Sequence, residues 1–77
     1  MAISAYILLN LITPKLQDTL AAIRAIDEVK SCDGVTGPYD AVAFVEAEDI
    51  NALGKVVTTK ISSVEAVAKT LTCVAVK

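Results

Sequence analysis

The sequence contains no histidine and no tryptophan, and its 77 residues include only two cysteines, two prolines and three glycines. Without histidine, the chain lacks the side chain most often used for proton transfer near neutral pH and for binding transition metals. Cys32 and Cys73 have no further cysteine at metal-ligand spacing, which argues against a zinc or redox site. We therefore expect no metal, no cofactor and no catalysis.

Charge is also sparse. Seven Lys and Arg stand against nine Asp and Glu, the net charge is −2, and the basic residues form no cluster that would attract a nucleic-acid backbone. No apolar stretch approaches the roughly 20 residues of a membrane span, and the N-terminus lacks the features of a signal peptide. These absences predict a cytoplasmic protein that contacts neither nucleic acid nor membrane.

Apolar residues are what the chain has in quantity, since 55% of it is hydrophobic. A chain this short buries only about 60% of the surface that its unfolded form exposes, so its own core is marginal. One domain over residues 1–77 and a tendency to self-associate are the first inferences.

The pattern of apolar and turn-forming residues predicts six elements. Thr13 is expected to cap the first helix, with Pro14 in the first helical position, and Glu48 or Asp49 is expected to open the second. The expected elements are a strand over 3–12, a helix over 14–26, a bulged edge strand over 29–36, a turn over 37–40, a strand over 41–47, a second helix ended by Ser62 and Ser63, and a strand over 64–76. The inner face of the second helix is expected to consist of Ile50, Leu53, Gly54, Val57 and Ile61.

The third element leaves one alternative open, because Asp33 and Gly34 could instead form a two-residue hairpin turn. Val29, Ser31, Asp33 and Val35 are otherwise expected to share one side of this strand. We favour the bulged edge strand, since the arms of such a hairpin would be very short.

A faint repeat supports two similar halves. Ile26 and Val29, like Ile61 and Val64, stand three residues apart where a helix gives way to a strand. This order predicts an α+β, ferredoxin-like βαββαβ fold with a four-stranded antiparallel sheet and two helices on one face. The cysteines would then lie on opposite edges of the sheet, roughly 14 Å apart, as buried or half-buried free thiols.

Both faces of the sheet are predicted to be apolar. In the first strand, Ala5, Ile7, Leu9 and Leu11 occupy one face, and Tyr6, Leu8 and Ile12 occupy the other. In residues 41–45, both the odd-numbered and the even-numbered positions are apolar. Two helices cover only one face, so we expect a second copy to pack against the other, as in a dimeric α/β barrel.

Few residues remain as candidates for a binding site. No carboxylates are spaced as a paired acid and base, and the glycines form no phosphate-binding pattern. The candidates are Gly37, Pro38, Tyr39 and Asp40 in the turn, with Thr70 and Thr72 in the last strand. One interpretation is that Asp40 only bonds amides of its own turn and that the threonines are only strand residues. Alternatively, the hydroxyls and loop amides bind a carboxylate while Asp40 accepts an ammonium group, as a site for an amino acid would.

The same residues carry a family resemblance that covers the chain from about Ala5 to Val76. Its most specific part is the block Val35-Thr36-Gly37-Pro38-Tyr39-Asp40, and the remaining carriers are Ile26, Val29, Asp49, Leu53, Val64 and Thr70-Leu71-Thr72. This pattern resembles the effector-binding (RAM) domain of the Lrp/AsnC transcriptional regulators. The resemblance implies dimers that assemble into tetramers, octamers or larger rings, with amino-acid effectors bound between dimers.

By this similarity, Gly37, Tyr39, Asp40, Thr70 and Thr72 would line the pocket. Pro38 departs from the family, in which this position is often polar, and proline stiffens the loop and removes an amide donor. The first strand is expected to begin within a few residues of Met1, so we expect no helix-turn-helix domain like that of the full-length regulators to precede it. The resemblance therefore implies a stand-alone module that does not itself read DNA and that could co-assemble with a full-length regulator.

Two other hypotheses remain open. The first is a small enzyme of the dimeric α/β-barrel kind, such as a monooxygenase or isomerase, for which Tyr6, Asn10 and Tyr39 would be the polar residues of a cavity between sheet and helices. The second is a purely structural oligomer without a ligand.

Overall fold

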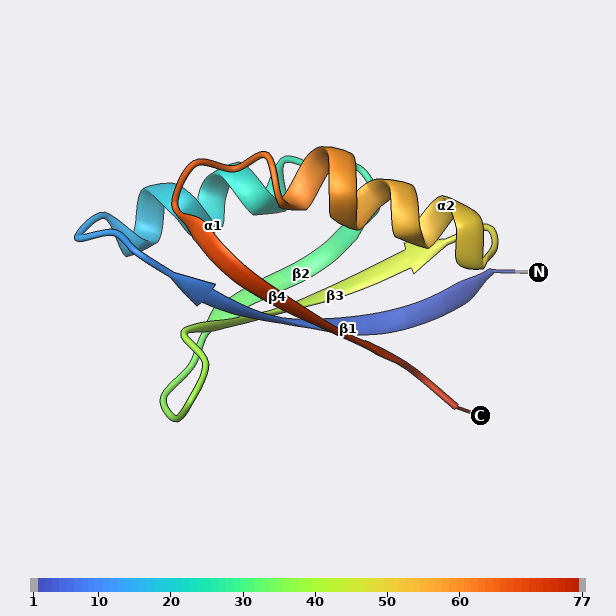
Figure 1. Ribbon diagram of the computed structural model, residues 1–77, viewed down its shortest axis with the longest axis horizontal. Helices are drawn as coiled ribbons and strands as arrows, with labels where there is room; N and C mark the ends of the chain where they lie inside the picture. The colour runs from blue at the N-terminus through green and yellow to red at the C-terminus, as the bar shows by residue number, and fades with distance from the viewer. Residues whose placement is uncertain (1, 77) are drawn as a thin grey trace.

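The computed structural model describes residues 2–76, which form one four-stranded antiparallel sheet with both helical segments on the same side (Figure 1). The strand order β2-β3-β1-β4 is that of the predicted ferredoxin-like fold. The elements are β1 (Ile3–Leu11), α1 (Leu16–Arg24), β2 (Val29–Gly34), β3 (Ala41–Ala47), α2 (Ile50–Lys55), its π-helical continuation η1 (Val56–Ile61) and β4 (Val67–Val74).

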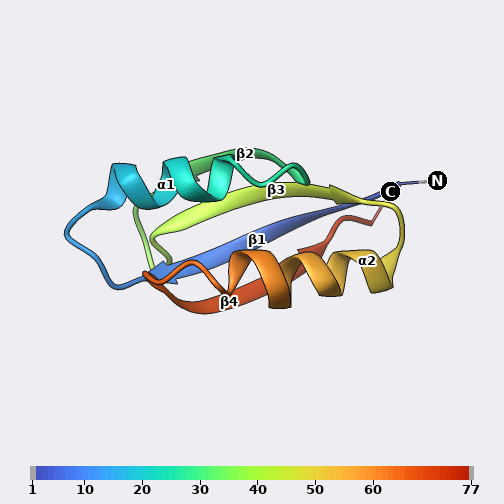
Figure 2. The ribbon, with the colours of Figure 1, turned by 90° about the horizontal axis from the view of Figure 1, so that it is seen from above.

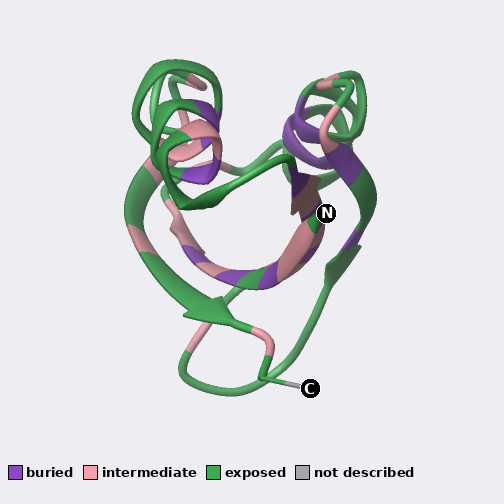
Figure 3. Ribbon diagram, turned by 90° about the vertical axis from the view of Figure 1, so that its right-hand side faces the viewer, coloured by how far each residue is buried: buried purple, intermediate pink, exposed green. Residues whose placement is uncertain are grey.

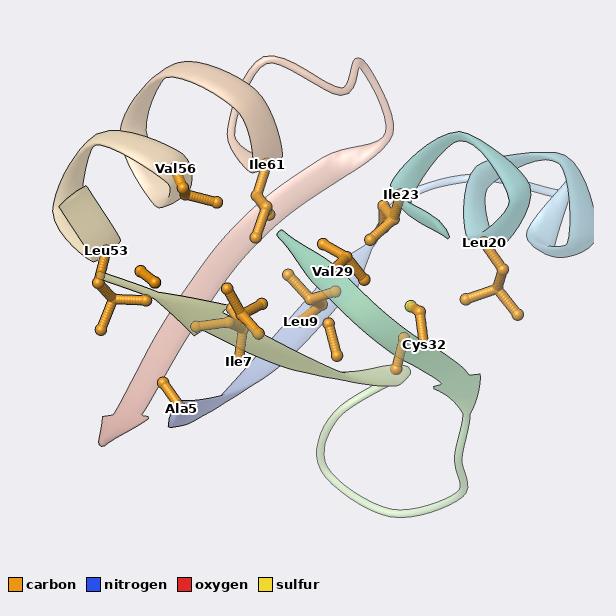
Figure 4. Packing of buried hydrophobic residues seen from close by; sticks show 14 residues of the cluster. Ala5, Ile7, Leu9, Leu20, Ile23, Val29, Cys32, Leu53, Val56 and Ile61 are labelled. Atoms are coloured by element: carbon orange, nitrogen blue, oxygen red, sulfur yellow. The ribbon is translucent and has the colours of Figure 1, made fainter. Parts of the chain in front are cut away.

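The core lies between the sheet and the helices. Strand side chains alternate between the two faces. The odd-numbered residues of β1, which were predicted to share one face, lie with those of β3 on the side toward the helices. Ile7 of β1 lies opposite Ala43 of β3 and is fully buried. Figure 4 shows Ile7 and Leu9 among side chains from both helices, including Ile23 and Ile61.

Seen from above, α1 runs along the β2 half of the sheet, while α2 and η1 run along the β4 half (Figure 2). The first helix was predicted over 14–26, but it begins at Leu16 and ends at Arg24. Lys15, the N-cap residue, has a non-helical backbone and makes no side-chain cap. The hydroxyl of Thr13 instead accepts a hydrogen bond from the amide of Lys15 at 2.9 Å, so Thr13 and Pro14 belong to the preceding turn.

The second helix begins as predicted, since the Asp49 carboxylate caps it by accepting a hydrogen bond from the Ala52 amide at 2.8 Å. Its inner face differs from the prediction. The last turns are π-helical, which places the buried residues Val56 and Ile61 five positions apart. Ile50, at the start of the α-helical segment, is 60% exposed, although it was predicted to lie on the inner face.

The bulge predicted in β2 is present. Its register against β3 shifts between Val29 and Ser31, so Val29 and Cys32 both point into the core, which strict alternation does not allow. Gly34 pairs with Ala41 as the last residue of the strand, which excludes the alternative turn at Asp33 and Gly34. The strand ends there and does not continue to residue 36.

The repeat seen in the sequence corresponds to a repeated turn. The amide of Val29 donates to the carbonyl of Ile26 at 3.0 Å, and the amide of Val64 donates to that of Ile61 at 3.1 Å. After the second of these turns β4 begins only at Val67, later than predicted.

Both cysteines are free and lie in the two edge strands, as predicted, but only Cys32 is buried and Cys73 is exposed. Burial raises the pKa of the Cys32 thiol, which keeps it protonated. None of the helices within residues 2–76 is long and apolar enough to cross a membrane.

Candidate functional site

The loop between β2 and β3, residues 35–40, extends from one end of the sheet past the face that the helices leave open (Figure 1). Gly37 has φ 121°, a conformation that side-chain-bearing residues rarely adopt, as its place in the predicted turn requires. The carbonyl of Pro38 accepts a hydrogen bond from the Asn10 side-chain amide at 2.9 Å. The loop is therefore fastened to β1, a contact that the sequence analysis missed; an asparagine inside an apolar strand was its only signal.

Asp40 fixes the other end of the loop. Its backbone amide donates to the carbonyl of Leu9, and its carbonyl accepts from the amide of Val35. Its Oδ2 atom accepts a hydrogen bond from the amide of Leu11 at 2.8 Å, so the side chain bonds the end of β1 and not its own turn. Among the described residues no hydrogen bond reaches Oδ1, and Asp40 is exposed, so this oxygen can accept a bond from another molecule.

Thr70 and Thr72 lie opposite Leu9 and Ile7 of β1. They therefore occupy the helix-facing side of the edge strand β4, on one face as predicted. Thr72 also borders an apolar hollow of about 230 Å³ between β4 and α2. The residues around this hollow are Ile50, Leu53, Gly54, Val57, Thr58, Thr72 and Val74.

The two halves of the predicted site do not meet within one chain. Leu9 pairs with Ala41 on one side and with Thr70 on the other, so the Asp40 loop and Thr70 are at the same end of the sheet. Two strand spacings, about 10 Å, separate them. The loop extends beyond the open face, whereas the threonines are on the helix-facing side (Figure 1). The hollow that Thr72 borders is lined by no residue of the loop.

The face of the sheet that carries no helices, here called the open face, is apolar along its centre. Its central residues are Tyr6, Leu8, Val42, Phe44, Leu71 and Cys73. Tyr6 pairs with Phe44 and with Cys73, and Leu8 pairs with Val42 and with Leu71. The rings of Tyr6 and Phe44 have centroids 5.1 Å apart. Tyr6 is 48% exposed and Leu71 46% exposed, so this surface is in contact with water in the single chain.

The residues of the enzyme hypothesis are placed differently from what it requires. Tyr6 lies on the open face, not between sheet and helices, and Asn10 holds the carbonyl of Pro38. Tyr39 is half-buried in the loop. No group of three potential metal ligands occurs within residues 2–76.

Comparisons with known proteins agree with this structure. Residues 4–77 match the family model of the Lrp/AsnC ligand binding domain. Over 47 residues the chain is 38% identical to the HTH-type transcriptional regulator Ptr1 of Methanocaldococcus jannaschii, a match that covers 61% of this chain and 32% of that protein. The chain thus matches about a third of the length of this regulator.

Two solved structures show the same fold. TTHA0845 from Thermus thermophilus is 37% identical with a TM-score of 0.90, covering 97% of this chain and 94% of that one. The transcriptional regulator NMB0573 from Neisseria meningitidis, solved as a complex with L-Met, is 25% identical with a TM-score of 0.87, covering 97% of this chain and 50% of that one. Because the family model spans nearly the whole sequence, the chain belongs to the Lrp/AsnC ligand-binding domain family.

Proposed function

We propose that this chain is a regulatory module that binds an amino-acid effector and acts by changing its own state of association. The observation that carries the proposal is the Asp40 carboxylate, one oxygen of which is held by the amide of Leu11 while the other has no bond among the described residues. A carboxylate fixed in this way can accept an ammonium group without first losing conformational freedom.

The chemistry of the other candidates complements Asp40. Exposed backbone amides in the loop around Gly37, together with the hydroxyls of Thr70 and Thr72, supply donors for a carboxylate. An amino acid presents both an ammonium and a carboxylate group. The similar Neisseria regulator was solved with L-Met, which supports a ligand of this class.

Self-association follows from the open face. Tyr6, Leu8, Phe44 and Leu71 place apolar side chains on a surface that the chain itself does not cover. A second copy packing against this face would remove it from water and stabilise the fold at the same time. The resulting unit is a dimer joined through the sheets.

The effector site is completed by a second chain in this proposal. Within one chain, the Asp40 loop and the Thr70–Thr72 segment lie on different sides of the sheet, so one ligand cannot reach both sets. Contacts between dimers can bring the loop of one chain to the strand of another. Binding of the effector then favours the larger assembly by mass action, and a full-length regulator could be a partner in it.

Thermal unfolding in the presence of each standard amino acid tests the proposal. At least one is expected to raise the melting temperature, because a ligand that binds only the folded state stabilises it. Asp40→Asn keeps an oxygen for the Leu11 amide but removes the charge, so it should lower the unliganded melting temperature only slightly and lose the ligand-induced rise. A panel in which no amino acid changes the melting temperature would contradict effector binding and favour a purely structural oligomer.

A further inference from the structure

The apolar hollow between β4 and α2 adjoins one half of the proposed effector site. Its volume is about 230 Å³, and Thr72 forms part of its wall. Thr70 lies two residues away on the same helix-facing side of β4, and Val74 continues that side along the hollow. Figure 3 shows that β4, the strand leading to the C-terminus, is exposed or half-exposed throughout. A ligand can therefore reach the two threonines and the hollow together.

The opposite wall of the hollow belongs to the second helical segment. It consists of Ile50, Leu53, Gly54, Val57 and Thr58, which recur at the three- and four-residue spacing of side chains on one face of a helix. Gly54 contributes no side chain, and a Cβ there would meet nothing within 4 Å. This wall is therefore apolar and leaves room at its centre.

The hollow offers little to a polar ligand group. None of the seven residues that line it is charged. The hydroxyl of Thr58 donates a hydrogen bond to the carbonyl of Gly54 at 2.9 Å, so its proton is already used. The other hydroxyl, that of Thr72, is assigned to the carboxylate of the effector in the proposed function. A polar group placed in the hollow would lose hydrogen bonds to water and find few partners, which disfavours it.

We propose that this hollow receives the side chain of the effector, and that the effector is an amino acid with an apolar side chain, such as leucine or methionine. With the effector's carboxylate at the hydroxyls of Thr70 and Thr72, a side chain that extends along β4 toward Val74 enters the hollow. This selectivity rests on the proposed function, because it belongs to the same site.

The size of the hollow agrees with such a ligand. An apolar cavity of roughly 150 Å³ is large enough for a benzene ring. A hollow of about 230 Å³ therefore accommodates the side chain of leucine or methionine. Ile50 is 60% exposed at this wall, so binding would remove apolar surface from water on the protein as well as on the ligand.

Pairs of amino acids with side chains of nearly equal size test the selectivity. Isothermal titration calorimetry of the wild-type protein would compare L-leucine with L-asparagine and L-methionine with L-glutamine, within a panel of all standard amino acids. The apolar member of at least one pair should bind at least about tenfold more tightly than its polar counterpart, because the polar side chain is desolvated without partners.

The outcomes of this panel separate the two proposals. Tightest binding by asparagine, glutamine or any charged amino acid would overturn the apolar selectivity and leave effector binding standing. If no amino acid bound, the proposed function would fail, and the selectivity with it.

Filling the hollow tests its occupant directly. Gly54→Leu adds a side chain at the centre of the helical wall and replaces a residue that is unfavourable inside a helix. The variant should therefore unfold at an equal or higher temperature, yet bind the apolar amino acid at least about tenfold more weakly. Asn51→Leu is the control, since Asn51 is exposed on α2 and does not line the hollow, and it should bind as the wild type does. Wild-type affinity in Gly54→Leu would overturn the proposal.

Widening the hollow gives an independent measurement. Val57 is half-buried in the helical wall, and Val57→Ala removes two methyl groups from it. The affinity for L-phenylalanine relative to L-leucine should rise by roughly threefold, because the larger side chain gains the space. A general loss of stability would weaken both ligands alike. A ratio of affinities that stayed at the wild-type value would contradict the placement of the side chain in this hollow.

Discussion

The two faces of the sheet have nearly the same apolar character but different surroundings. On the helix-facing side Ile7 and Leu9 are fully buried, whereas on the open face Tyr6 and Leu71 remain about half exposed. The first face is completed by the chain's own helices. The second has an apolar centre without a cover among the described residues, which is the arrangement that favours association with another copy.

The largest effect is expected on the helix-facing side. Ile7→Ala should lower the free energy of unfolding by about 3 kcal/mol, since it leaves a cavity at a fully buried position. Urea unfolding of dilute protein measures this loss. The matched variant Leu8→Ala, one residue away on the open face, should cost clearly less under the same conditions, and equal losses would contradict the distinction between the faces.

Strand parity predicted from the sequence that both faces of the sheet are apolar and that the helices cover only one, but it did not indicate which residues face the helices. The order of apolar runs and turn-forming residues was enough to predict the topology of the sheet. The π-helix was not predicted from the sequence, because the ordinary helical period had assigned Val57 and not Val56 to the inner face.

The sequence predicted less of the candidate site than of the fold. The motif around Asp40 indicated the loop, but its hydrogen bond to Leu11 joins residues 29 positions apart, and local spacing contains no signal for such a contact. Spacing also placed Thr70 and Thr72 on one face without indicating that this is the helix-facing side, away from the loop.

A charge at the centre of the open face should prevent association while leaving the fold intact. Leu8→Lys is expected to weaken the dimer by about 2 kcal/mol, roughly thirtyfold in Kd, because an apolar contact is lost and a charge must be buried. Sedimentation velocity over a range of concentrations gives the Kd. An unchanged Kd would show that this face is not the interface.

A smaller effect is expected at the loop that borders the open face. Asp40→Ala removes the acceptor for the Leu11 amide and should lower the free energy of unfolding by about 1 kcal/mol. Asp40→Asn retains an acceptor and should cost less, as measured by urea unfolding. If both variants lost the same stability, the hydrogen bond would not be what fastens the loop.

The smallest effect belongs to an exposed contact outside both faces. The Lys60 ammonium, 2.9 Å from the Glu28 carboxylate, lowers the pKa of that carboxyl below its ordinary value of 4.5. A lowered pKa in the folded state stabilises the fold above pH 4.5, and this contribution is lost as the pH falls through the folded-state value. Glu28→Gln should therefore be slightly less stable than wild type near neutral pH, and the difference should vanish in acid. A difference that persisted unchanged in acid would have another cause.

The most direct test of the account measures assembly and effector binding together. Sedimentation velocity of the wild-type protein, with each standard amino acid at millimolar concentration, should show at least one amino acid that shifts the distribution toward larger species. The same amino acid should leave Asp40→Asn unchanged. A wild-type distribution that no amino acid alters, with no change in melting temperature, would contradict the assignment of this chain as an effector-binding regulatory module.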